Sequence, residues 1–209
     1  VAERWRETTK VPLLQAYGLT ETSPAATMNP LDMKAFNGAI GLPISSTEVM
    51  IRDDNGNEVP LTQVGEICIR GPQVMKGYWQ RPDETENVFY QDGFLRTGDM
   101  GYVDAQGYVF LVDRKKDMIL VSGFNVYPNE VEEAVAMHPG VVDVAAIGVA
   151  DEHSGEAVKI FVVRKDPKLT EKALIEHCRT VLTGYKIPKH IEFAMTCRAP
   201  TSARSCVAH

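Results

Sequence analysis

The chain has 209 residues, with 22 Lys or Arg, 28 Asp or Glu, and a formal charge of -6. Apolar residues make up 44% and charged residues 24%, as is typical of a folded globular protein. The acidic balance argues against a nucleic-acid-binding protein, which would carry a basic surface. No apolar run approaches the roughly 18 residues of a membrane-spanning helix. The chain begins at Val1 without a secretory segment, so we expect a fragment of a longer protein.

Cysteine spacing indicates a reducing compartment. Cys68 and Cys178 stand singly within apolar patterns, and Cys197 and Cys206 lie close to the end of the chain. No CxxC or Cys/His ligand spacing occurs, so we expect neither a disulfide framework nor a zinc site. The scattered histidines are assigned structural or solvated roles. We therefore predict a cytoplasmic protein.

The first part of the chain has the pattern of short β-strands. Glu48–Arg52 and Glu66–Arg70 alternate apolar and polar residues, which predicts half-buried strands. Asp53–Gly56 predicts a turn between them, and Gly107 closes a second turn before the apolar run Tyr108–Val112. We expect this part to be mostly β, with few helices.

The pattern changes after the charged segment DRKKD, residues 113–117. Pro128 suits the first position of a helix, and Thr170 suits the cap of a second helix. Val144–Val149 and Val158–Val163 are β-branched runs typical of buried strands. The apolar face of the second helix is predicted to comprise Leu174, Ile175, Cys178, Val181 and Leu182. We predict an α+β fold of two domains with a charged junction.

Two short motifs contain residues suited to nucleotide chemistry. In YGLTE, residues 17–21, Tyr17 could stack on a flat base, and Thr20 with Glu21 is a plausible ligand pair for Mg²⁺ on phosphates. In GFLRTGD, residues 93–99, Asp99 could accept both hydroxyls of a ribose. Taken singly, each motif is more typical of an ordinary surface turn than of a nucleotide site.

A third segment, DRKKDMILVSGFNVYPNEVEE, spans residues 113–133. Lys116 lies at the predicted domain junction, where a hinge would absorb dihedral changes. Gly123 would permit the close approach of a ligand chain. A solvated linker would explain the charges here but not the Gly-Phe-Asn string.

These segments resemble the core motifs of the adenylate-forming enzymes, both in their residues and in their order along the chain. A fourth such segment is GPQVMKGYWQRPDET, residues 71–85. DGFLRTGDMGYVDAQGYVFLVDRKK, residues 92–116, is similar to the fatty-acyl signature of bacterial long-chain fatty-acid CoA ligases. The resemblance runs from Val1 to about Phe193. It implies that residues 1–113 are the mostly β trailing part of a large N-terminal AMP-binding domain. Residues 114–194 would then form a small, mobile α+β C-terminal domain.

The resemblance also implies a two-step reaction: fatty acid and ATP give an acyl-adenylate, from which coenzyme A displaces AMP. The implied adenosine-binding residues are Tyr17, Gly18, Asp99 and Arg114. Thr20 and Glu21 would meet the phosphates and Mg²⁺. Lys116 matches the hinge, and Gly123 would line the tunnel for the pantetheine arm. Trp79 and Pro82 are expected to be packing and turn residues.

Two parts of the family pattern are missing. The phosphate loop and most of the acyl pocket would precede Val1, and no LPxxxxGK segment with its catalytic lysine follows Phe193. Lys186 and Lys189 belong to a different segment, YKIPK. Codons that encode residues 195–209 can also spell DLPRTNVGKILRRA in another reading frame. We therefore expect this tail to be a frameshift product, or else a divergent disordered tail, and expect the chain to be inactive alone.

Other interpretations stay open at this point. The chain could derive from a ligase of the same superfamily that acts on another acid, or serve as a non-catalytic binding module. A further alternative is that only residues from about 115 onward fold. The resemblance implies peripheral contact with the inner membrane, although no basic amphipathic helix supports it. The sequence does not indicate an oligomeric state.

Overall fold

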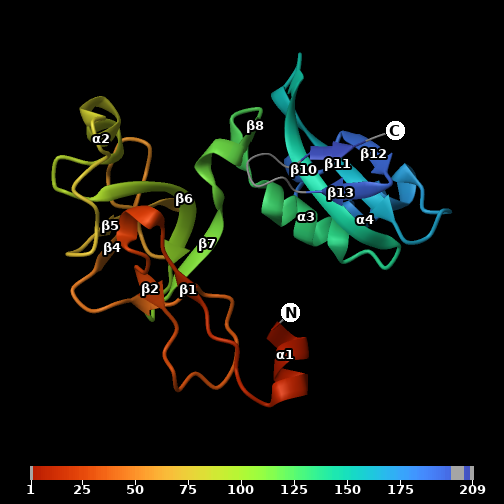
Figure 1. Ribbon diagram of the computed structural model, residues 1–209. Helices are drawn as coiled ribbons and strands as arrows, with labels where there is room; N and C mark the ends of the chain where they lie inside the picture. The colour runs from red at the N-terminus through yellow and green to blue at the C-terminus, as the bar shows by residue number, and fades with distance from the viewer. Residues whose placement is uncertain (1, 199–204, 208–209) are drawn as a thin grey trace. The chain divides into compact units, whose positions relative to one another are not determined.

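The computed structural model describes residues 2–198 and 205–207. The chain divides into two compact units, Val1–Lys115 and Lys116–His209, each of which is described by itself. Strands predominate and helices are few, so the predicted α+β class, with a mostly β first part, is confirmed (Figure 1).

The first unit contains two antiparallel sheets. A small sheet contains β1 (Ala16–Tyr17), β2 (Thr27–Met28) and β3 (Leu42–Pro43). The larger sheet contains, in chain order, β4 (Glu48–Arg52), β5 (Gly65–Arg70), β6 (Leu95–Val103) and β7 (Val109–Arg114). The helical segments are α1 (Ala2–Thr9), the 3-10 turn η1 (Thr20–Thr22) and α2 (Pro82–Val88). The core contains Ala26, Ile40, Ile51, Ile67, Ile69 and Val109.

Two strands were predicted nearly to their bounds, but the predicted exposure of one was wrong. β4 spans the predicted residues, and β5 begins one residue earlier at Gly65. β5 is buried from Gly65 to Ile69, Glu66 included, rather than half-buried. It lies between β4 and β6 in the sheet, and Glu66, Ile67, Cys68 and Ile69 are all buried. The turn at Asp53 is confirmed, with the side chain accepting from the amide groups of Asn55 and Asn57.

Strand β6 contains a bulge. Met100 pairs with Glu66 and Arg96 pairs with Cys68, so the three residues Thr97–Asp99 lie opposite Ile67 alone. Gly98 adopts a φ of +72°, which favours glycine. Bulges bend a strand and redirect side chains. Here the bulge removes Asp99 from the ladder with β5, while Asp99 still pairs with β7.

The second unit has a five-stranded sheet and two helices. Its strands are β8 (Ile119–Val121), β9 (Phe124–Val126), β10 (Val141–Asp151), β11 (Gly155–Arg164) and β12 (His190–Ala194). Its helical segments are the 3-10 turn η2 (Lys115–Asp117, beginning at the last residue of the first unit), α3 (Pro128–Ala136), α4 (Glu171–Val181) and the 3-10 turn η3 (Gly184–Lys186). β11 pairs with β10 and β8 in antiparallel fashion and with β12 in parallel. α3 and α4 share one buried core with the sheet (Figure 1).

The helix starts follow the sequence. Pro128 occupies the first turn of α3, and the Thr170 hydroxyl accepts from the Ala173 amide at the start of α4. Both predicted strands exist and are longer than expected. On α4, Leu174 and Cys178 are fully buried, whereas Val181 is 48% exposed, so its assignment to the apolar face was wrong. Val181 is the last residue of the helix, and the following residue, Leu182, is buried in the core instead.

Near the end of the chain, β13 (Thr196–Arg198) pairs with β14 (Ser205–Val207) in antiparallel fashion. The predicted tail, 195–209, falls partly on residues 199–204 and 208–209, which lie outside the described residues. Among the helices that the structure describes, none has both the length and the apolar character to cross a bilayer.

Candidate active site

The structure brings Tyr17 and Asp99 together from two separate motifs. The Tyr17 hydroxyl, at the end of β1, donates a 2.6 Å hydrogen bond to Asp99 Oδ2. Burial and the Asp99 carboxylate raise the pKa of Tyr17 well above its ordinary value. The phenol therefore stays protonated and serves as a donor to the carboxylate.

Arg114 lies beside the same carboxylate. It pairs with Asp99 in the ladder between β6 and β7, and its Nε lies 4.0 Å from Asp99 Oδ1. The Arg114 side chain is 64% exposed, whereas that of Asp99 is only 14% exposed. This solvated contact is weak by itself, but it leaves a cation within reach of a ligand bound at Asp99.

Thr97 stabilises the backbone on which Asp99 is carried. Its hydroxyl donates to the Ile67 carbonyl at 2.8 Å and accepts from the Asp99 amide at 3.1 Å. The bulge is therefore tied to β5 by a side chain where ladder bonds are absent. Sequence reasoning missed Thr97, although it lies within the quoted motif GFLRTGD.

Gly18 has a structural explanation. A Cβ placed there would lie 1.7 Å from the Pro24 carbonyl oxygen. The protein's own backbone therefore occupies the space beside Tyr17, and no larger residue fits without moving it.

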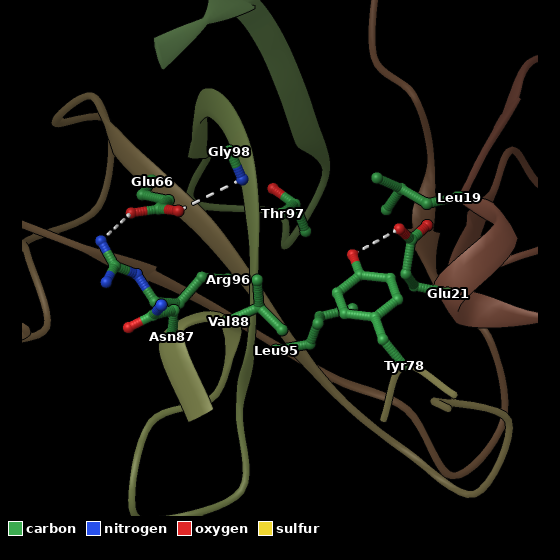
Figure 2. Close-up of a pocket in the computed structure, with 10 residues that line it drawn as sticks. All are labelled: Leu19, Glu21, Glu66, Tyr78, Asn87, Val88, Leu95, Arg96, Thr97 and Gly98. Atoms are coloured by element: carbon green, nitrogen blue, oxygen red, sulfur yellow. Dashed lines mark hydrogen bonds and ion pairs between the residues drawn. The ribbon is translucent and has the colours of Figure 1, made fainter. Parts of the chain in front are cut away.

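Glu21 and Thr20 both lie in η1, but their surroundings differ. Glu21 Oε1 accepts a 2.8 Å hydrogen bond from the Tyr78 hydroxyl, and Glu21 lines a pocket of about 350 Å³ (Figure 2). Thr97 and Gly98 line the same pocket, so Glu21 and the bulge that carries Asp99 share one cavity. Thr20 is exposed and is not among the residues that line it.

Two further residues of this region were not singled out from the sequence. Tyr78, from KGYW, orients Glu21; its position in a quoted motif was the available signal. Glu66, on β5, also lines the pocket and was expected only as part of an alternating strand. Trp79, expected to pack, is 88% exposed, so that expectation was wrong for the described chain. Pro82 begins α2.

Lys116 and Gly123 belong to the second unit. Lys116 is exposed within η2. Ser122 and Gly123 form the two-residue turn between β8 and β9, with φ values of 51° and 82°. Two successive residues in the left-handed region make a type I′ hairpin turn. Apart from its two chain neighbours, no described residue has a heavy atom within 4 Å of the position of a Cβ on Gly123.

Both lysines of the YKIPK segment form ion pairs. Lys186 Nζ donates to both carboxylate oxygens of Glu130 at 2.6 and 2.7 Å. Lys189 Nζ donates to Asp151 Oδ2 at 2.6 Å. These lysines join elements of the fold, which agrees with their assignment to YKIPK rather than to a catalytic segment.

Comparisons with known proteins place both parts of the chain in known families. The AMP-binding enzyme family matches residues 1–79, and the AMP-binding enzyme C-terminal domain matches residues 130–200. A long-chain-fatty-acid–CoA ligase of Escherichia coli O6:H1 is 58% identical over 193 residues, covering 92% of this chain and 34% of the relative.

Solved structures show the same likeness. ATP-bound MatB from Rhodopseudomonas palustris is 37% identical, with a TM-score of 0.90 over 97% of this chain and 40% of that one. The o-succinylbenzoate CoA synthetase MenE from Bacillus subtilis, in complex with its acyl-adenylate intermediate, is 33% identical, with a TM-score of 0.83 over 94% of this chain and 40% of that one. The chain thus spans about a third of the length of the curated relatives it matches. It belongs to the AMP-binding, adenylate-forming enzyme family.

Proposed function

We propose that this chain is part of an ATP-dependent, AMP-forming long-chain fatty-acid CoA ligase and supplies its adenosine-binding residues. The observation that carries the proposal is the 2.6 Å hydrogen bond between Tyr17 and Asp99. It joins the motif suited to a base to the motif suited to a ribose. The 58% identity to a named fatty-acid ligase favours a long-chain fatty acid as the acyl substrate.

In this proposal each residue has a separate task. Asp99 accepts the two ribose hydroxyls, and Tyr17, held against it, offers its ring to adenine. Arg114 contributes positive charge beside them. In the second unit, Lys116 serves as the hinge, and Gly123 gives the pantetheine arm of coenzyme A a path without a side chain.

Glu21 is suited to bind Mg²⁺ jointly with the phosphate oxygens of the nucleotide. In the part of the chain that the structure describes, no three His, Cys, Asp or Glu residues gather into a metal cluster. Magnesium on nucleotides is ordinarily held by one or two carboxylates plus phosphate oxygens, which a single glutamate satisfies. Glu21, with Thr20 beside it, would hold the ion, which would neutralise phosphate charge. Tyr78 keeps the carboxylate oriented.

The proposal also includes a cellular location for the protein. The cysteine pattern favours the cytoplasm, because Cys68 and Cys178 are both free and buried. A fatty-acid substrate that partitions into bilayers favours peripheral contact with the inner membrane.

Adenosine binding by the chain itself tests the nucleotide role. Titration with adenosine is expected to shift the backbone amide resonances of Tyr17 and Asp99, whereas 2′,3′-dideoxyadenosine, which lacks the diol, should shift them less. The Asp99→Ala variant should lose that distinction. Equal shifts by both nucleosides would contradict the ribose role.

The ligase activity needs a longer protein. The chain can be joined to the upstream two thirds of the E. coli relative, once with its own residues 195–209 and once with DLPRTNVGKILRRA in their place. Palmitate-dependent pyrophosphate release is expected only from the second version. Release by neither version would refute the ligase assignment, and equal release by both would refute the need for the restored lysine.

A further inference from the structure

Glu66 is a buried carboxylate to which the proposed reaction gives no role. Its side chain is 3% exposed and lies on β5, between two other strands. A carboxylate removed from water in this way is costly unless cations and hydrogen-bond donors surround it. The hydrogen-bond donors around Glu66 therefore identify the residues that it positions.

One oxygen holds the bulge. Glu66 Oε1 accepts from the Gly98 amide at 3.2 Å, next to Asp99 (Figure 2). Gly98 lies where the ladder between β5 and β6 is interrupted, so a side chain replaces the missing strand partner. This bond complements the one from the Thr97 hydroxyl on the other side of the bulge.

The other carboxylate oxygen of Glu66 binds Lys115, the residue before Lys116. Glu66 Oε2 accepts from Lys115 Nζ at 3.0 Å, and Arg96 Nη2 lies 3.4 Å away. Lys115 Nζ also lies 2.8 Å from Asp54 Oδ1. Burial alone would lower the pKa of Lys115, but the bonds from Asp54 and Glu66 outweigh it, so the pKa is raised and the ammonium stays charged.

We infer that Glu66 is a positioning residue that couples the Asp99 bulge to the domain junction through the two oxygens of one carboxylate. Gly98 precedes the ribose acceptor, and Lys115 precedes the hinge residue Lys116. A change in the position of Lys115 is thereby transmitted to the backbone of Asp99 without contact with the ligand. The catalytic meaning of this coupling rests on the proposed function; the coupling itself does not.

Amide hydrogen exchange on the full chain tests the coupling. In Glu66→Gln, the exchange rate at the Gly98 and Asp99 amides should rise about tenfold, as expected when a hydrogen bond to a charged group is weakened. Lys115→Met should raise the rate at the same two amides, although Lys115 does not contact them. Lys115→Arg keeps a cation within reach of Glu66 and should restore wild-type rates.

Two controls separate coupling from general loosening. Asp54→Asn removes the other partner of Lys115 and should leave the Gly98 amide unchanged. Glu48→Gln breaks an exposed pair with Arg70 on the same sheet and should also leave the Gly98 amide unchanged. A change at Gly98 in Glu66→Gln but not in Lys115→Met would overturn the inference, as would an equal rise throughout β4 and β5. No nucleotide is needed, so failure of adenosine binding would count against the proposed function alone.

Discussion

Tyr17 and Asp99 lie 82 positions apart in the sequence, and the hydroxyl of one donates to the carboxylate of the other at 2.6 Å. Burial and that carboxylate raise the pKa of the phenol above its value in an unfolded chain, about 10. The contribution of Tyr17 to stability is therefore fully present below about pH 10 and is lost as the pH rises toward the folded-state pKa.

We predict that the midpoint of thermal unfolding falls more steeply between about pH 9 and pH 11 for the wild-type chain than for Tyr17→Phe. At neutral pH the variant should lose about 1 kcal/mol, the ordinary net contribution of a hydrogen bond. Circular dichroism melts at matched ionic strength give both quantities. Parallel curves for the two proteins across that range would contradict the assignment.

Gly18→Ala should destabilise the first unit by about 1–3 kcal/mol, the usual cost of overpacking. The new Cβ would lie 1.7 Å from the Pro24 carbonyl oxygen, so the backbone must shift. Gly184→Ala is the control, because in the described part of the chain only its neighbours in sequence come within 4 Å of a Cβ at that position. Urea unfolding of both variants gives the comparison, and equal midpoints would show that the turn at Pro24 moves freely.

Asp151 gives the second unit an acid-sensitive contact. The Lys189 ammonium, followed by the Ser154 hydroxyl and amide, lowers the pKa of Asp151. Its stabilising effect is therefore present above the unfolded value of about 3.9 and is lost as the pH falls below it. Acid titration followed by far-ultraviolet circular dichroism should show that lowering the pH destabilises Asp151→Asn less than it destabilises the wild-type chain. An identical acid response in the two proteins would exclude this role.

The frameshift hypothesis makes a prediction about DNA. Codons 195–209 of the gene should carry the bases that spell DLPRTNVGKILRRA in the second frame. Sequencing the coding DNA gives a direct answer, since any codon incompatible with that frame ends the hypothesis. The same hypothesis predicts that the chain as it stands releases no pyrophosphate from ATP and palmitate.

Local sequence rules were sufficient where neighbouring residues determine the structure. Pro128 favours the start of α3 through its fixed φ, and Thr170 caps α4 through a bond to its own first turn. Asp53 organised its own turn. The motifs also pointed to Tyr17 and Asp99, although only the folded chain shows that the two meet.

The sequence could not predict features that depend on strand order. The alternation in EICIR suggested that Glu66 faces water, but β5 has a neighbour on each side and Glu66 is buried. The bulge at Thr97–Asp99 depends on how β6 is aligned with β5, which no local pattern encodes. The role of Glu66 follows from both facts.

Lys115 and Lys116 are identical neighbours with opposite surroundings. The Lys115 side chain is 27% exposed and tethered by two carboxylates, whereas that of Lys116 is exposed and has no bond to any residue that the structure describes. The change from a tethered to an exposed side chain therefore occurs from one residue to the next, within a single 3-10 turn. If Lys116 is the hinge, as we propose, the pivot would be marked by the release of a side chain, because neither position holds glycine or proline.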